Sequence, residues 1–316
     1  MPDSDPDPEE AHVIATFARG AFPGAQLRTG IGDDAAVFDD GRLVTVDTMV
    51  EGVHWDDKLS PGDVGWKLVA VNVSDIGAMG GRPEWAVLAI SVPRPLDRSW
   101  IEAFHEGLQA ACAHWGVALV GGDTTRSPVR TAALTVGGRA ERPVLRSGGR
   151  PGHDLWVTGT LGLAAEGFLS GTPRAAARAW LRRPEPPVAF GRALAERGLA
   201  SAMMDLSDGL HVDLARLCAA SGCGATIDAD AVPGDGPLPW RVAFGEDYQL
   251  LFAAPAEERD AVRSIARMQE IPLARIGGLE APPGLRLGGG ALWPPALFTH
   301  FGASAPGGPP RAPGAS

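Results

Sequence analysis

Seven aspartates stand in five short clusters that begin at Asp33 and end at Asp208, far apart along the chain. Like charges at close range repel and raise each other's pKa, so these carboxylates can share one pocket only if a counter-charge neutralises them. Lys58 and Lys67 are the only lysines, which makes hard divalent cations the obvious counter-charge. Such cations also bridge to phosphates, so the pattern favours metal-assisted phosphoryl transfer. The clusters are Gly32-Asp33-Asp34, Val46-Asp47-Thr48, Ser74-Asp75-Ile76, Gly121-Gly122-Asp123-Thr124-Thr125 and Asp205-Leu206-Ser207-Asp208-Gly209.

Length, composition and net charge limit the classes of protein to which this chain can belong. The chain has 316 residues and 45% hydrophobic content, which is enough for two ordinary domains with real cores. A formal net charge of −10 argues against a nucleic-acid partner, because nucleic-acid binders usually present a basic face. No apolar run is long enough for a membrane span, and the first residues lack the basic and apolar regions of a signal peptide. We therefore expect a cytoplasmic protein without a membrane or nucleic-acid partner.

The cysteines indicate neither a disulfide framework nor a zinc site. Cys112, Cys218 and Cys223 are odd in number, and none belongs to a Cys-x-x-Cys pair. We expect buried or incidental thiols.

Strand-like and helix-like segments alternate along the chain, which predicts an α/β (α+β) protein with two mixed domains. An Asp-Gly turn at 39–42 between two β-rich runs predicts a hairpin whose second strand, 43–49, carries Asp47. Ser60 followed by Pro61 predicts the start of a helix that runs to Met79, with Asn72 and Asp75 on one face. A strand at 117–120 should run directly into Gly121-Gly122-Asp123.

The domain boundary is expected at a glycine-rich linker around residues 146–152. The expected organisation is a tail at 1–8, a first domain at 9–145 that carries most of the acidic clusters, a second α/β domain at 146–302, and a tail at 303–316. Both tails are rich in Pro, Gly, Asp or Ser and offer little to bury.

Familiar nucleotide and catalytic motifs are absent or weak. Gly30-Ile31-Gly32-Asp33-Asp34-Ala35 fits G-x-G-x-x-A, but no convincing strand precedes it, and two aspartates would repel a pyrophosphate; a plain acidic turn and a metal-binding loop remain the alternatives. A Walker A loop, the protein-kinase motifs, an EF-hand loop and a G-x-S-x-G elbow are all missing. His54 follows Asp47 closely enough to reach the same cleft, although an ordinary loop histidine is the alternative.

Each acidic cluster taken alone has a simpler explanation. Aspartate favours turns and helix caps, and Asp208 before Gly209-Leu210 could simply cap a helix. Five clusters that combine Asp with Gly, Ser or Thr are more than capping requires, so we favour a shared site.

Eight motifs resemble the thiamine-monophosphate kinase family of the aminoimidazole ribonucleotide synthetase-like superfamily, and the match runs in order from about residue 9 to 301. They are Gly30-Ile31-Gly32-Asp33-Asp34-Ala35, Val46-Asp47-Thr48, Val71-Asn72-Val73-Ser74-Asp75, Ala78-Met79-Gly80, Val120-Gly121-Gly122-Asp123-Thr124-Thr125-Arg126, Val157-Thr158-Gly159-Thr160, Asp205-Leu206-Ser207-Asp208-Gly209-Leu210 and Gly245-Glu246-Asp247-Tyr248.

The resemblance implies transfer of the ATP γ-phosphoryl group to thiamine monophosphate, giving thiamine diphosphate, with several Mg²⁺ ions and often K⁺. It also implies two mixed α/β domains of the superfamily fold and a homodimer whose N-terminal sheets build a barrel. Its metal ligands would correspond to Asp33, Asp34, Thr45, Val46, Asp47, Asp75, Asp123, Asp205 and Asp208. Its ATP contacts would correspond to Gly122, Asp123, Arg146 and Ser207, its substrate contacts to His54, Glu246 and Trp293, and its catalytic residues to Asp75, Asp123, Asp208 and Arg146.

Some positions depart from the family pattern. Val46 stands where the family commonly has threonine, so only its backbone carbonyl could bind a metal, and Gln249 replaces a frequent glutamate. Trp293 and Phe298 are both candidates for the aromatic residue against the thiamine ring.

Two other functions remain open at this point. A synthetase of the same fold would use ATP to activate an amide or selenide, although no cysteine precedes Cys112 to serve a selenide-using relative. A non-catalytic metal or nucleotide sensor is the alternative from a different class.

Overall fold

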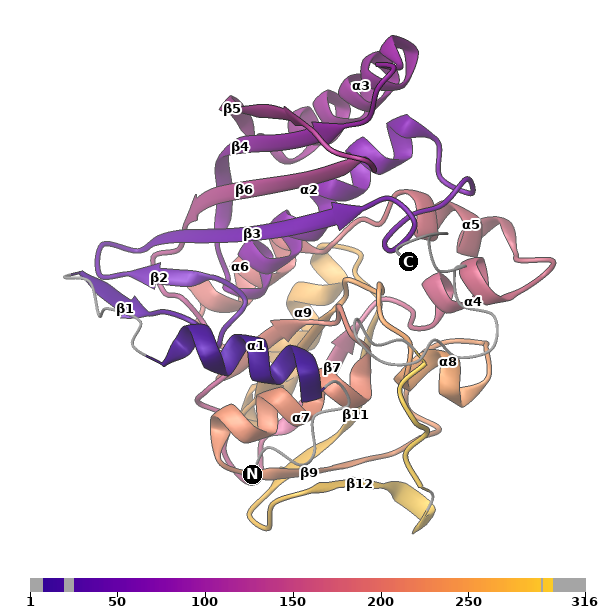
Figure 1. Cartoon of the computed structure of the whole chain (residues 1–316). Helices are drawn as coiled ribbons and strands as arrows, with labels where there is room; N and C mark the ends of the chain where they lie inside the picture. The colour runs from indigo at the N-terminus through magenta and orange to yellow at the C-terminus, as the bar shows by residue number, and fades with distance from the viewer. Residues whose placement is uncertain (1–7, 20–25, 291, 298–316) are drawn as a thin grey trace.

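Two mixed β-sheets, one from each half of the chain, organise the computed structural model, which describes residues 8–19, 26–290 and 292–297 (Figure 1). In the first sheet only β4 and β5 pair in parallel; the other neighbours are antiparallel. Its strand order is β1-β2-β3-β6-β4-β5. The strands are β1 (Leu27–Thr29), β2 (Ala36–Phe38), β3 (Arg42–Val50), β4 (Arg82–Val92), β5 (Ala118–Arg126) and β6 (Thr131–Arg139).

The second sheet has the order β12-β9-β11-β7-β10-β8, and its single parallel pair is β12 with β9. Its strands are β7 (Asp154–Thr158), β8 (Ala202–Asp205), β9 (Gly224–Ile227), β10 (Leu250–Ala254), β11 (Leu273–Glu280) and β12 (Leu285–Leu287). The predicted boundary after residue 145 falls between the last strand of the first sheet and the first strand of the second. The exact residue at which the first domain ends and the second begins stays a prediction.

Helix α2 (Pro61–Ala78) is the central element of the fold. The Ser60 side chain accepts from the Asp63 backbone N–H while the Asp63 carboxylate accepts from Ser60 N, a reciprocal cap that starts the helix where the sequence predicts it. Helix α3 (Arg98–Trp115) crosses α2 at very short range: a Cβ on Gly107 would lie 1.9 Å from the Gly62 carbonyl oxygen. Only glycine permits this contact, which buries α2 between α3 and the second half of the chain.

The other side of α2 faces the C-terminal half. Trp66 Nε1 donates to the Pro184 carbonyl at 3.1 Å, and a Cβ on Gly191 would lie 2.2 Å from the Gly77 carbonyl oxygen. Consequently α6 (Val188–Glu196) packs closely on α2 (Figure 1). Side chains on α2 therefore reach both halves of the molecule.

Among the remaining helices, α7 and α9 share core clusters with strands of the second sheet, α4, α5 and α8 lie together to one side, and α1 lies beside α7 (Figure 1). The sequence analysis predicted no helix at the position of α1, and most of the two predicted tails lies outside the described residues. No helix in the described part of the chain is long and apolar enough to cross a membrane. These elements are α1 (Pro8–Ala18), α4 (Leu163–Leu169), α5 (Ala175–Arg182), α7 (Leu210–Ser221), α8 (Leu238–Val242), α9 (Arg259–Met268) and the 3₁₀ turns η1 (Ala256–Glu258) and η2 (Gly288–Gly290).

One strand differs from its prediction in a way that affects the site. Strand β5 continues to Arg126, so Gly122 and Asp123 lie inside it and not after its end. The extension forms because residues from Gly121 onward pair in parallel with β4, where a Cβ on Gly122 would lie 1.9 Å from the Leu88 carbonyl oxygen. The prediction of a strand ending at residue 120 was wrong because tertiary pairing overrides the low β-propensity of glycine.

Candidate functional site

Two polar residues on one face of α2 connect the helix to β3. Asn72 Oδ1 accepts from the Asp47 backbone N–H at 3.1 Å, while its amide group donates to the Leu68 carbonyl at 2.8 Å. Thr45 Oγ1 lies 2.5 Å from Asp75 Oδ2 and 3.2 Å from the Asp34 carbonyl oxygen. The predicted shared face of Asn72 and Asp75 is confirmed, and it fixes Asp47, Asp75 and the Asp34 backbone relative to one another.

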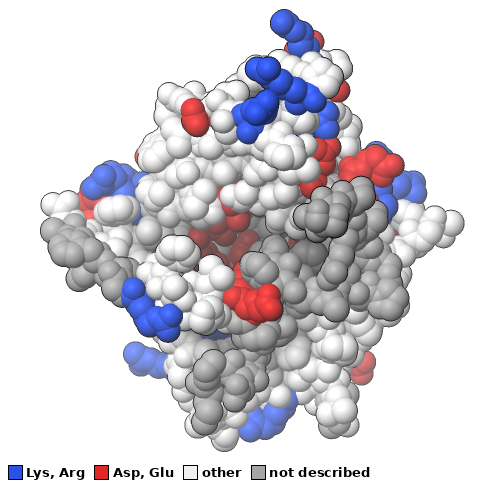
Figure 2. Space-filling view, viewed as in Figure 1, with Lys and Arg blue, Asp and Glu red and all other residues white. Residues whose placement is uncertain are grey.

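A third residue of α2 brings in the second sheet. Ser74 Oγ donates to Asp205 Oδ2 at 2.6 Å, across the boundary between the two halves. As a result one carboxylate oxygen from each of Asp34, Asp75 and Asp205 lies within 4.8 Å of the other two. Figure 2 shows acidic side chains recessed in a hollow at the middle of this face of the molecule.

Arg146 supplies a positive charge in direct contact with this cluster. Its guanidinium donates to Asp34 Oδ1 at 2.6 Å, and its backbone N–H donates to the Asp33 carboxylate at 3.1 Å. Arg146 belongs to the segment that connects the two sheets, so the same residue links that segment to the Asp33-Asp34 loop. Arg146 therefore contacts the acidic cluster, while its predicted contact with ATP and its catalytic role stay predictions.

Burial and mutual repulsion raise the pKa values of the clustered carboxyl groups. Burial is the larger cause throughout. It raises the pKa of Asp205 to about 8, together with the charge of Asp34, and that of Asp75 well above its ordinary value, together with Asp47 and Asp205. The pKa of Asp47 rises to about 6 through burial and the nearby Asp208, and that of Asp33 to about 6 through burial and Asp34. One guanidinium is thus too little counter-charge for the group.

The donors fit a hard divalent cation such as Mg²⁺. The converging side-chain atoms are all oxygens, which is the ligand type that Mg²⁺ prefers. Asp34 Oδ2 is buried and has no hydrogen-bond partner among the described residues, although a buried carboxylate oxygen normally has one. An ion at this position would satisfy that oxygen and offset the repulsion.

Asp208 approaches the cluster from a rigid turn. Asp213, in the first turn of α7, accepts from the backbone N–H groups of Asp208 and Gly209 at 3.0 Å each. Gly209 has φ 106°, a conformation that favours glycine. Arg216 forms an ion pair with Asp208, and the charge of Asp208 contributes, after burial, to the raised pKa of Asp47. Ser207, in the same turn, is half-buried.

Asn72, Ser74 and Asp213 were not singled out from the sequence as site residues. The first two lie inside the motif Val71-Asn72-Val73-Ser74-Asp75, where the helical period relates Asn72 to Asp75 but gives no signal for Ser74. Asp213 supports the turn by accepting hydrogen bonds from backbone N–H groups. Because its partners are not side chains, the residue types in the sequence do not reveal this contact.

Asp123 and Gly122 are not brought to the cluster within this chain. The paired residues Asp47, Leu134, Leu88 and Gly122 run across β3, β6, β4 and β5, so β5 lies three strand spacings, about 14 Å, from β3. Asp123 is exposed and shares its row with Thr48, which points to the face opposite Asp47. Val46 also points to that open face and is 59% exposed, so only its backbone could face a metal.

The predicted substrate residues occupy three separate loops. His54 follows β3, and its Nδ1 accepts from the Val50 backbone N–H at 3.1 Å. Glu246 lies beside the Asp208 turn, because its backbone N–H donates to the Ser207 carbonyl at 2.8 Å. Trp293 stacks on His211, near the start of α7, with ring centroids 4.7 Å apart. Their contact with a substrate stays a prediction, and the other aromatic candidate, Phe298, lies outside the described residues.

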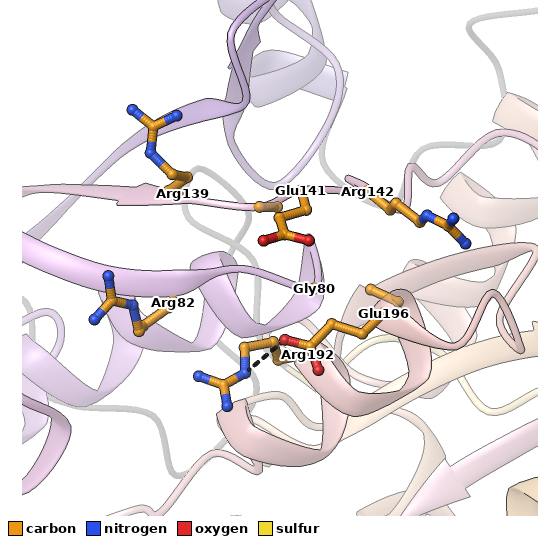
Figure 3. Close-up of a pocket in the computed structure, with 9 residues that line it drawn as sticks. Gly80, Arg82, Arg139, Glu141, Arg142, Arg192 and Glu196 are labelled. Atoms are coloured by element: carbon orange, nitrogen blue, oxygen red, sulfur yellow. Dashed lines mark ion pairs between the residues drawn. The ribbon is translucent and has the colours of Figure 1, made fainter.

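A second pocket lies at the boundary between the two halves of the chain. Its wall includes Arg82, Arg139 and Arg142 from one side, and Arg192 and Glu196 of α6 from the other. In Figure 3 these arginines point away from one another and Glu141 lies between them, while Arg192 pairs with Glu196 at 3.2 Å. The arginine side chains do not point toward one place where they could bind an anion together. The acidic cluster is therefore the better candidate for the functional site.

Comparisons with known proteins show the family to which the chain belongs. Residues 32–140 match the family model described as AIR synthase related protein, N-terminal domain, and residues 150–289 match the corresponding C-terminal domain. A thiamine-monophosphate kinase of Salmonella typhimurium is 38% identical over 294 residues, covering 85% of this chain and 89% of that protein.

Solved structures give the same assignment. The crystal structure of thiamine-monophosphate kinase from Stenotrophomonas maltophilia matches with a TM-score of 0.74 and 36% identity, covering 89% of this chain and 96% of that one. A structure described as AaThiL complexed with AMPPCP and TMP matches with a TM-score of 0.78 and 29% identity, covering 89% and 94%. The chain therefore belongs to the AIR synthase related family and, within it, to the family of thiamine-monophosphate kinases.

Proposed function

We propose that this protein transfers the γ-phosphoryl group of ATP to thiamine monophosphate and so produces thiamine diphosphate. The observation that carries the proposal is the convergence of Asp34, Asp75 and Asp205, with one carboxylate oxygen left unpaired, in a chain of this family. A relative has been solved with AMPPCP and TMP, which supports an ATP-dependent reaction.

Both reactants carry negative charge, so their repulsion is the main obstacle to the reaction. Mg²⁺ bound by Asp34, Asp47, Asp75, Asp205 and Asp208 would neutralise that charge. Arg146 adds a fixed positive charge at the edge of the cluster and holds the Asp33-Asp34 loop in place. Asn72, Ser74 and Thr45 orient the carboxylates by hydrogen bonds, which reduces reorganisation when the phosphates bind.

The transfer is direct and in line. An oxygen of the acceptor phosphate forms a bond to the γ-phosphorus while the bond from that phosphorus to the β,γ-bridging oxygen breaks and ADP leaves. No strong base is needed, because a phosphate monoester has its second pKa near 6 and is mostly dianionic at neutral pH. The aspartates therefore serve as ligands in this scheme and not as proton acceptors.

The reactive unit in this proposal is a homodimer whose first sheets join into a barrel. The open face and outer edge of the first sheet support it, since Val46 and Val120 are 59% and 64% exposed there. In such a dimer Gly122 and Asp123 would serve the site of the other copy. Glu246, His54 and Trp293 would contact the thiamine part of the substrate.

Incubation with ATP, Mg²⁺ and thiamine monophosphate, followed by chromatography, tests the proposal. Thiamine diphosphate and ADP should appear in equal amounts, and only when Mg²⁺ is present. ATP consumption without thiamine diphosphate would point to a synthetase of the same fold, and binding without ATP consumption would point to a sensor; either result would refute the kinase proposal.

A further inference from the structure

Lys67, on α2, is almost completely buried: its side chain is 2% exposed. Its ammonium lies 2.6 Å from Glu246 Oε1, the one ion-pair partner that the structure gives it among the described residues. A buried ammonium needs such a partner because its transfer from water is costly. The pair joins a helix of the N-terminal half to a loop of the C-terminal half.

The loop that carries Glu246 is held in an unusual conformation. Glu246 has φ 65° and Tyr248 has φ 46°, although neither is glycine. Their backbone N–H groups donate to Ser207 and Leu206 at 2.8 Å each, and the buried carboxylate of Asp247 accepts from Gly162 N at 3.0 Å. Left-handed backbone at non-glycine residues persists where the surroundings enforce it, and such places cluster at functional sites.

The spacing along α2 relates this pair to the acidic cluster. Lys67 and Ser74 are seven residues apart, so they lie on one face of the helix, two turns or about 10 Å from each other. Ser74 holds Asp205 of the cluster, and Lys67 holds Glu246. One helix face thus carries both contacts, the one that holds the cluster and the one that holds the Glu246 carboxylate.

We propose that Lys67 is a positioning residue that holds the Glu246 carboxylate in place relative to the acidic cluster, where it contacts the organic part of the phosphate acceptor. This inference rests on the proposed function for its substrate. Lys67 does not itself bind a phosphate in this scheme, because its ammonium is buried and already paired. Glu246 is the exposed member of the pair, with 27% of its side chain open to solvent.

Kinetics of Lys67→Met, Glu246→Gln and the double variant test the proposal. Lys67→Met should raise KM for thiamine monophosphate about tenfold while kcat and KM for ATP change less than about threefold. Lys67→Arg should recover part of the loss. The double variant should be no worse than Glu246→Gln, because residues that act through one another are not additive.

Arg183→Gln is the matched control. Arg183 also joins the C-terminal half to α2, through a 2.8 Å contact with Asp63 near the start of that helix. Its loss should leave KM for thiamine monophosphate unchanged. An equal rise of KM in this control, an unchanged KM in Lys67→Met, or additive effects in the double variant would each overturn the proposal.

Hydrogen exchange separates this inference from the proposed function. If the wild-type protein does not phosphorylate thiamine monophosphate, the proposed function fails and the backbone amides of residues 246–248 decide the positioning role alone. Faster exchange of these amides in Lys67→Met than in Arg183→Gln supports it, and equal exchange in the two variants overturns it.

Discussion

Asp123 lies on the face of the first sheet opposite Asp47 and three strand spacings away from it. A side chain cannot cover about 14 Å and cross the sheet, so one chain alone does not place both carboxylates on one metal. The acidic cluster of each copy is therefore incomplete if Asp123 takes part in the reaction. If Asp123 takes part in the reaction, activity therefore requires the proposed dimer, and this requirement can be tested.

Mixing two inactive variants should restore activity. Asp75→Asn and Asp123→Asn would each inactivate a homodimer, but a mixed dimer carries one site with both native residues. Random exchange of subunits should give about a quarter of the wild-type turnover, since half of the dimers are mixed and each has one intact site. Turnover after unfolding and refolding the mixture together measures this, and no recovery would place Asp123 outside the site of the partner.

Removing one carboxylate from the cluster should lower activity but raise stability in the absence of metal. Asp75→Asn should reduce turnover by about 100-fold or more, because ligands and oriented charges at the reacting phosphate would be lost. In EDTA the same variant should melt at a higher temperature than the wild type, since one repelling group is gone. Asp260→Asn, on the exposed side of α9, is the control that should alter neither property.

Loss of the Arg146 guanidinium should have the opposite effect on stability. Arg146→Gln leaves Asp34 buried beside other carboxylates, and breaking such a pair costs about 3 kcal/mol of unfolding free energy. Urea unfolding in EDTA measures the loss, which Mg²⁺ should reduce, and KM for ATP should rise. Arg150→Gln, an exposed residue nearby, should behave as the wild type; equal effects of the two substitutions would argue against a specific role of Arg146.

Local signals predicted α2 and part of the site well. Ser60 and Pro61 mark the start of the helix, and the helical period places Asn72 and Asp75 on one face, as the structure confirms. The Asp-Gly turn at 39–42 likewise predicts the β2-β3 hairpin.

Features that depend on tertiary contacts were not predictable from local patterns. The length of β5 depends on its parallel pairing with β4, and the face of Asp123 depends on the register of four strands. Asp213 and Lys67 act on residues of other segments or on backbone groups, so their sequence neighbourhoods carry no distinctive pattern. Helix α1 begins with Pro8, Glu9 and Glu10, which are ordinary helix-start residues, so its absence from the prediction was an error and not a lack of signal.

The raised pKa values predict how pH and Mg²⁺ act on stability. Without metal, Asp205 has a pKa of about 8 and Asp47 and Asp33 have values of about 6, all above the ordinary 3.8. Between pH 4 and 8 the native state thus binds more protons than the unfolded chain, so its stability is greatest at the low end and falls as pH rises through 6 and 8. Calorimetric melting in EDTA should show this decline, and Asp205→Asn should weaken it near pH 8. Mg²⁺ should release protons on binding at pH 7, measurable by titration calorimetry in buffers of different ionisation enthalpy; binding without proton release would contradict a metal site at these carboxylates.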